Sequence, residues 1–147
     1  MSRIGWLDCG SGVSGDMLLG ALADLGALED LQQLVESLST LGVEVTTAET
    51  TRAGLRAVSV TVVAPADQPH RTIAEVRAVI DGAAMPDDAR QRAVNVFERL
   101  ARAEAQVHGI AADEVEFHKV CAVDSIVDLL GACLGLHALG LDRVVVS

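Results

Sequence analysis

Aromatic side chains are nearly absent from this 147-residue chain, which contains one Trp, two Phe and no Tyr. Half of the residues are nevertheless hydrophobic, so Ala, Leu and Val must supply the core. Small aliphatic side chains favour closely packed helices over a core built around large rings. The length is sufficient for a buried core, and we expect residues 1–147 to form a single domain.

Basic residues are also scarce. The chain has 11 Lys and Arg against 21 Asp and Glu, which gives a formal net charge of −10. Binding to nucleic acid requires a cationic surface that neutralises phosphates, and this composition argues against such a surface. An anionic chain can still bind a small anionic molecule when a metal ion or a helix N-terminus faces that molecule.

Cysteines are few, and long apolar runs are missing. Cys9, Cys121 and Cys133 form no C-x-x-C pair and occur without a signal peptide, which predicts a reducing, cytoplasmic setting. No run of 18 or more apolar residues is present, so we expect no membrane span. The G-x-S-x-G, H-E-x-x-H and Walker motifs are also missing, which leaves nucleophilic hydrolase chemistry without support.

Hydrophobic periodicity and turn residues predict a mixed α/β fold. The expected strands are 3–9, 43–51, 55–63 and 144–146, and the expected helices are 16–25, 29–41, 72–80, 85–107 and a segment from 119 to near 140. Thr72 followed by Glu75 is a capping-box pattern. The element order favours an α/β or α+β sandwich, in which helices cover a mixed sheet of about four strands. The last strand ends without a polar tail, which we interpret as the end of an N-terminal piece of a longer protein.

The segment 116–131 (EFHKVCAVDSIVDLLG) is the one place where ionisable residues interrupt an apolar run. A helix here would carry a stripe at three- and four-residue steps, made of Cys121, Asp124, Asp128, Gly131 and Gly135. The other positions are apolar, which is typical of a buried helix. Buried carboxylates are costly unless they are paired, hydrogen-bonded or bound to a cation. The stripe therefore indicates a metal ion or cationic ligand; alternatively, its acids cap neighbouring helices or face water.

Gly10, Gly12 and Gly15 match the G-x-G-x-x-G pattern of dinucleotide-binding loops, after a strand and before a helix. Two features oppose that interpretation. A helix is predicted where the second strand and its acid should follow, and Asp16 places a carboxylate where the pyrophosphate would bind.

The same loop suits a cation. Asp8 and Asp16 flank it, and Ser11 and Ser14 lie between them. Carboxylates and hydroxyls around exposed backbone N–H groups can hold a hydrated cation, or a cation bridged to a phosphate. The alternative is that Asp8 caps the turn and Asp16 complements the helix dipole.

His118 precedes the predicted buried helix and would lie at the mouth of the site. It is either a structural residue or a metal ligand. Together with the carboxylates and Cys121, it suits a borderline metal such as nickel, zinc or iron better than magnesium alone. His70 and Arg71 follow Pro69 in a linker, and they reach a ligand only if that linker folds over the site.

Two segments resemble the LarC family of nickel-insertion proteins. The first is LDCGSGVSGDM at 7–17, followed by LLGAL, and the second is FHKVCAVDSIVDLLG at 117–131; VFERLA at 96–101 and EAQVHG at 104–109 also fit. The likeness runs in order along essentially the whole chain, which resembles the N-terminal domain of longer family members. Three positions depart from the usual family residues: Gly10 replaces a bulky aromatic residue, Lys119 replaces Glu and Cys121 replaces Gly.

The resemblance implies an enzyme that inserts nickel into pyridinium-3,5-bisthiocarboxylic acid mononucleotide. The implied reaction depends on CTP with Mg or Mn, forms nickel–carbon and nickel–sulfur bonds, and yields the nickel-pincer nucleotide cofactor of lactate racemase. The resemblance places the CTP site in a C-terminal LarC portion outside this chain. That portion and the small-molecule nucleotide substrate are the expected partners, and the formation of a homo-oligomer is left open.

Residue chemistry and the resemblance together predict a site. The expected catalytic residues are His118, Asp124 and Asp128; the residues expected to hold the substrate phosphate are Ser11, Gly12, Ser14 and Gly15; and the expected metal ligands are Asp8, Asp16, His118 and Asp124. Lys119 in place of Glu removes one acid beside this set. Two alternatives are a nickel- or substrate-binding module that is inactive alone, and a metal-dependent phosphohydrolase.

Overall fold

The computed structural model describes residues 2–117 and 123–147. Its helices are α1 (Gly15–Asp24), α2 (Leu31–Ser37), α3 (Ile73–Gly82), α4 (Asp87–His108) and α5 (Val123–Ala138), with short 3-10 turns η1 (Ser39–Leu41) and η2 (Ala112–Glu114). Its strands are β1 (Ile4–Leu7), β2 (Glu44–Arg52), β3 (Leu55–Val63), β4 (Arg71–Thr72), β5 (Glu116–Phe117) and β6 (Arg143–Val146). The mixed α/β class expected from the sequence is confirmed. Within the described residues, no helix combines the length and the apolar character that crossing a membrane would need.

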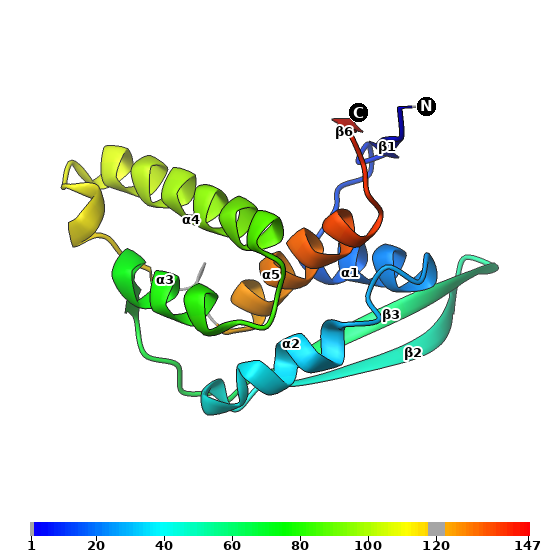
Figure 1. Ribbon diagram of the computed structural model, residues 1–147, viewed down its shortest axis with the longest axis horizontal. Helices are drawn as coiled ribbons and strands as arrows, with labels where there is room; N and C mark the ends of the chain where they lie inside the picture. The colour runs from blue at the N-terminus through cyan, green and yellow to red at the C-terminus, as the bar shows by residue number, and fades with distance from the viewer. Residues whose placement is uncertain (1, 118–122) are drawn as a thin grey trace.

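The strands do not join into the single sheet of about four strands that the sequence predicts. They form three separate two-stranded sheets: β1 with β6, β2 with β3, and β4 with β5. The first pair is parallel and the other two are antiparallel. Helices separate the pairs, because α1 packs against β3 on one side and against α5 on the other (Figure 1). The predicted hairpin is confirmed as β2–β3, and its turn is formed by Ala53 and Gly54, both with positive φ.

The helix α5 forms the centre of the core. It lies between α4 on one side and α1 with the β2–β3 hairpin on the other (Figure 1). Its apolar positions Val123, Ile126, Val127 and Leu130 are all fully buried. Phe97 from α4, one of the two Phe residues, is the largest fully buried side chain. The helix that the sequence marks as apolar on nearly every side is therefore the one that the others surround.

The helix predicted over 29–41 is shorter than expected. The segment before Leu31 forms turns, α2 ends at Ser37, and the 3-10 turn η1 follows. The hydroxyl of Ser37 donates to the carbonyl of Leu34 at 2.6 Å and accepts from the N–H of Ala84 at 2.8 Å. Serine side chains that bond to nearby backbone compete with helix continuation. Gly42 then ends the segment in the left-handed conformation, as its position predicts.

The capping box at the start of α3 is confirmed. The Thr72 hydroxyl accepts from the N–H of Glu75 at 3.3 Å, and the Glu75 carboxylate accepts from the N–H of Thr72 at 2.7 Å. We expect Thr72→Ala to lower the free energy of unfolding by about 1 kcal/mol, because the substitution removes the hydroxyl that accepts from the N–H of Glu75. Urea denaturation followed by circular dichroism measures the change. Ser14→Ala is the matched control, since Ser14 occupies the N-cap of α1 without capping it through its side chain; an equal loss in both variants would contradict the prediction.

Candidate functional site

Gly15, at the start of α1, lies directly against the side chain of Asp128 in α5. A Cβ atom at position 15 would lie 2.7 Å from Cβ and Cγ of Asp128 and closer still to its Oδ2. Gly131 and Gly135 continue the contact, because a Cβ there would lie 2.7 and 2.9 Å from leucine side chains of α1. From Asp128 onward, the stripe predicted on α5 therefore faces α1. The glycine loop and the buried helix, which are far apart in the sequence, meet at this point.

The carboxyl group of Asp128 is partly buried and short of partners. Its Oδ1 is shielded from solvent and has no hydrogen-bond partner among the described residues. Burial, and then the negative charges of Asp16 and Asp124, raise the pKa of Asp128 from 3.8 to about 6. Desolvation and neighbouring like charges both disfavour the ionised form of a carboxyl group. The structure thus brings Asp16, Asp124 and Asp128 into one electrostatic environment, of the kind that functional acids often occupy.

The loop before α1 presents its hydroxyls and backbone at the surface. Ser14 holds the predicted N-cap position, but its hydroxyl donates to Oδ1 of Asp16 instead of capping the helix. Gly12, with a φ of 89°, turns the loop, and its N–H donates to the carbonyl of Cys9 at 2.8 Å. Ser11 is exposed. The N–H groups in the first turn of a helix have no acceptor within the helix, so they are suited to bind an anion or a carboxylate.

Asp8 follows β1 directly and is held in a turn. Its Oδ1 accepts from the N–H of Gly10 at 3.2 Å and from the hydroxyl of Ser147 at 3.3 Å. These contacts match the alternative interpretation of Asp8 as a turn cap. The charge of Asp8 is not among those that raise the pKa of Asp128. Of the two acids that flank the loop, Asp16 is therefore the one that acts on Asp128.

Asp124 is exposed in the first turn of α5 and borders an open hollow of about 440 Å³. Its Oδ1 accepts from the N–H of Ser125 at 2.8 Å. The remaining lining of the hollow comes from the end of β3 and the linker that follows: Val62, Val63, Ala64, Pro65, Ala66 and Gln68. The linker therefore lies beside one of the predicted catalytic acids.

The end of the same linker runs alongside the segment that leads into the site. β4 pairs with β5, which places Arg71 opposite Phe117. Arg71 is only 8% exposed, and its guanidinium donates to Oε1 of Gln68 at 3.3 and 3.4 Å. Nδ1 of His70 lies 4.0 Å from a carboxylate oxygen of Glu116. The sequence had left open whether the linker reaches the site. It marked Arg71 through its place after Pro69, but it did not indicate that Arg71 is buried.

Some predicted site residues lie outside the described part of the chain. These are His118, together with Lys119 and Cys121, so the ligand role of His118 stays a prediction. Among residues 2–117 and 123–147, no three His, Cys, Asp or Glu side chains lie close enough together to hold a metal ion. The acids around Asp128 therefore interact through their charges without forming a complete ligand set by themselves.

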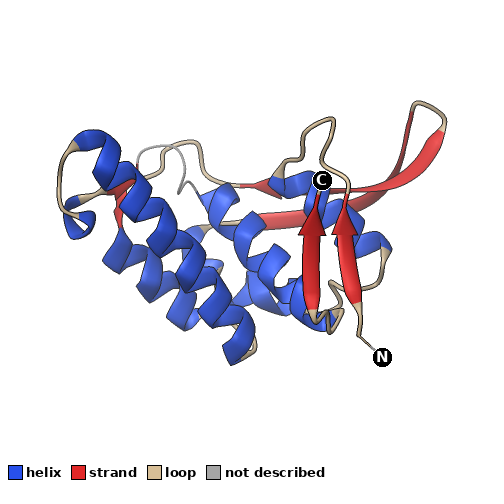
Figure 2. Ribbon diagram, turned by 90° about the horizontal axis from the view of Figure 1, so that it is seen from above, coloured by secondary structure: helices blue, strands red, loops and turns tan. Residues whose placement is uncertain are grey.

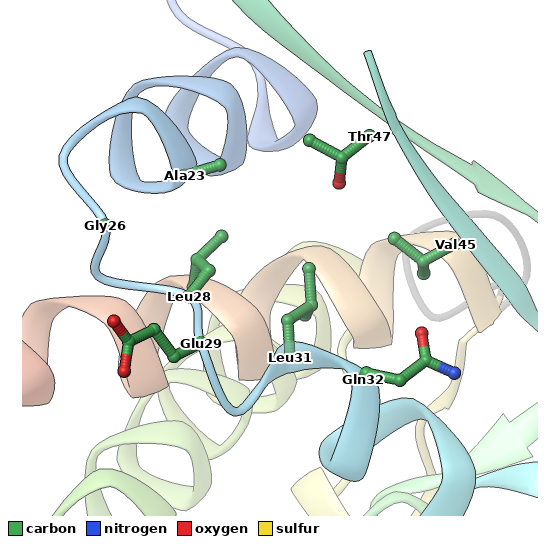
Figure 3. A pocket seen from close by; sticks show the side chains of 8 residues that line it. All are labelled: Ala23, Gly26, Leu28, Glu29, Leu31, Gln32, Val45 and Thr47. Carbon is green, nitrogen blue, oxygen red and sulfur yellow. The ribbon is translucent and has the colours of Figure 1, made fainter.

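A different hollow lies away from this site. It has a volume of about 300 Å³ and is bounded by the end of α1, the start of α2 and β2 (Figure 3). Its lining residues are Ala23, Gly26, Leu28, Glu29, Leu31, Gln32, Val45 and Thr47. None of the residues predicted to bind metal or substrate lines it. The acids at the α1–α5 contact therefore remain the candidate site. They define an α/β protein in which a glycine loop faces the partly buried carboxyl group of Asp128.

Sequence comparison shows the family of this chain. The model of the nickel insertion protein family matches residues 5–147, and the chain belongs to that family. A pyridinium-3,5-bisthiocarboxylic acid mononucleotide nickel insertion protein of Desulfitobacterium hafniense is 37% identical over 148 residues, covering 99% of this chain and 36% of the relative. The protein of the same name from Staphylococcus epidermidis is 34% identical over 148 residues. The match covers 100% of this chain and 38% of that relative. The resemblance predicted from the two motifs is confirmed.

A relative from Roseiflexus castenholzii, also named for nickel insertion, is 40% identical over 148 residues. The match covers 100% of this chain and 38% of that relative. The chain therefore spans little more than a third of the length of these curated relatives. No solved structure matches the chain.

Proposed function

We propose that this chain is the portion of a nickel insertion protein that holds nickel and pyridinium-3,5-bisthiocarboxylic acid mononucleotide while the metal is inserted. Two relatives carry the name of this substrate. The observation that carries the proposal is the contact of the Gly10–Gly15 loop with Asp128, because it joins an anion-binding loop to a group of acids. A substrate that carries a phosphate and receives a metal cation requires both features.

The loop is assigned to the phosphate of the mononucleotide. Ser11, Gly12, Ser14 and Gly15 supply hydroxyls and backbone N–H groups next to the start of α1. Asp16 in the first turn would repel a bare phosphate, so a cation between the two balances the charges. In this proposal Asp16 and Asp124 hold that cation or the nickel ion, with Asp8 and His118 as the further predicted ligands.

Asp128 is assigned the role of proton acceptor. A nickel–carbon bond to the pyridinium ring forms when the ring C–H proton leaves and its electron pair binds nickel, so a base must take the proton. A general base works best when its pKa is near the working pH, and the pKa of Asp128 is raised to about 6. Its Oδ1 has no hydrogen-bond partner among the described residues, so no described donor there stabilises the ionised form.

The remaining parts of the proposal concern the longer protein. CTP, with Mg or Mn, is assigned to the portion of the family protein that this chain does not span. The product is proposed to be the nickel-pincer nucleotide cofactor of lactate racemase, made in the cytoplasm.

A second candidate is a binding module that holds nickel or substrate and turns over only with the rest of the protein. Two observations favour it: the chain matches only 38% of a relative, and its described residues contain no group of three metal ligands. Assaying nickel insertion by the chain alone, and then by an intact family protein that includes it, separates the two candidates.

Nickel titration of the chain by isothermal calorimetry tests the metal site. We expect Asp16→Ala and His118→Ala each to weaken nickel binding at least about tenfold, since each removes a proposed ligand. Glu36→Ala, an exposed acid on α2, is the control and should leave the affinity unchanged. Unchanged affinity in both Asp16→Ala and His118→Ala would remove the metal site from the proposal.

A further inference from the structure

The parallel pair β1–β6 has two open edges. Ile4 to Leu7 pair with Arg143 to Val146, and among the described residues no third strand pairs with either one. Figure 2 shows the two arrows side by side, with the N- and C-termini at this pair. In a two-stranded sheet, the outer edge of each strand leaves backbone N–H and C=O groups without ladder partners. Parallel sheets otherwise occur almost only where more strands and covering layers bury them.

The side chains of this pair are apolar and exposed. Ile4 and Trp6 are 58% and 66% exposed, and on the other strand Val146 is 58% exposed. Alternation along a strand places Ile4 and Trp6 on one face, and the register places Val146 beside Leu7 on the opposite face. Both faces therefore present apolar side chains to solvent. Exposed apolar side chains that gather at one strand pair are typical of a surface that contacts another polypeptide.

An apolar hollow of about 300 Å³ lies between this pair and the helices α1 and α5. The helices and the turn before β6 contribute mainly leucines to its wall: Leu18, Leu22, Leu25, Leu136, Leu139 and Leu141. Leu25 is 66% exposed. The strand pair is thus loosely covered on its inner side as well as open on its outer side.

We propose that the β1–β6 pair, with its open edges and this hollow, is the docking surface for the portion of a nickel insertion protein that this chain does not span. That portion adds at least one strand beside β1 or β6 and buries Trp6. It amounts to more than half of each relative, since the matched region covers only 36–38% of their lengths. A second copy of this chain is the alternative occupant, and sedimentation of the chain distinguishes the two.

The position of the pair connects the docked portion to the candidate site. β1 leads directly into Asp8 and the Gly10–Gly15 loop, and β6 ends at Val146, next to Ser147, whose hydroxyl donates to Asp8. Ligand sites in parallel sheets lie at the carboxyl ends of the strands. A strand added here would place the docked portion next to the loop. Only this consequence rests on the proposed function; the docking surface itself does not.

Amide hydrogen exchange tests the docking surface. We compare the 147-residue chain with a fusion in which this chain replaces the 148 matched residues of the intact Roseiflexus castenholzii relative. Amides of 4–7 and 143–146 are expected to exchange about tenfold or more slowly in the fusion, because local opening is suppressed where a strand is added. The tip of the β2–β3 hairpin, where Leu55 is 73% exposed, is the internal control and should exchange equally in both proteins.

Equal exchange at β1 and β6 in the two proteins would overturn the proposal. The intact relative, in its natural form, provides a second measurement: its segments matched to 4–7 and 143–146 must be protected, and fast exchange there would overturn the proposal even if the fusion failed to fold. Sedimentation of the 147-residue chain completes the test. A dimer that protects the same amides would assign the surface to a second copy and also overturn the proposal.

Discussion

Gly15→Ala is expected to lower the free energy of unfolding by about 1 to 3 kcal/mol, the usual cost of forcing extra volume into a packed contact. The added Cβ would lie 2.7 Å from Cβ and Cγ of Asp128. Relieving this overlap requires the Asp128 side chain or the backbone of α5 to shift. The carboxyl group of Asp128 must then shift away from the loop. We therefore also expect nickel titration of this variant to show weaker binding than in the unaltered chain. Urea denaturation measures the change in stability.

Two further variants make this prediction specific. Gly82→Ala adds the same methyl group at the last residue of α3, where nothing lies within 4 Å, and it should be neutral or slightly stabilising. Asp128→Ala in the Gly15→Ala background removes the clashing carboxyl group and should recover part of the lost stability. Equal stability losses in Gly15→Ala and Gly82→Ala would show that Gly15 is not a contact residue.

Asp128→Asn is expected to stabilise the chain at pH 7 and to slow nickel insertion by the fusion protein. The pKa of Asp128 is raised from 3.8 to about 6 in the folded protein, so the fold binds this proton more tightly than the unfolded chain does. The corresponding stabilisation is complete below about pH 4 and is lost as the pH rises through 6. Because the group is partly exposed and screened by solvent, we expect a loss of about 1 to 2 kcal/mol. Asparagine carries no charge and avoids that loss.

Denaturation midpoints at pH 4, 5, 6 and 7 measure the difference between the unaltered chain and Asp128→Asn. The gain in stability of the variant should be small at pH 4, grow between about pH 4 and 6 and level off above pH 6, whereas Asp67→Asn, on the exposed linker, should show no such gain. In the fusion with the Roseiflexus castenholzii relative, Asp128→Asn should slow nickel insertion by about 10² to 10⁴-fold, the usual contribution of a general base. A variant that is more stable and fully active would contradict the catalytic assignment of Asp128.

Several local features of this protein could be predicted from its sequence. Three of them depend on a few neighbouring residues: the capping box at Thr72, the β2–β3 hairpin, and the end of the 3-10 turn η1 at Gly42. The three- and four-residue spacing of Asp128, Gly131 and Gly135 also predicted one face of α5. Helix periodicity is a property of the chain itself, so such a face can be read without knowing what packs against it.

The prediction of one mixed sheet was wrong for a physical reason. The four predicted strands were identified correctly or nearly so, and the two-residue strands β4 and β5 were not predicted. Strand pairing joins residues that are distant in the sequence, and no local pattern specifies the partner. The helix α1 packs between β3 and α5, with close contacts to α5 at Gly131 and Gly135. The strands are found in three separate pairs.

By itself the sequence determined the two motifs, the helix faces, the scarcity of basic residues and, through the motifs, membership in the nickel insertion family. Only the tertiary structure decided that Gly15 lies against Asp128, that Asp16 rather than Asp8 acts on that carboxyl group, and that β1 and β6 pair with open edges. Identity and spacing are fixed by covalent order, whereas burial, the raised pKa of Asp128 and open strand edges arise only when distant segments pack together.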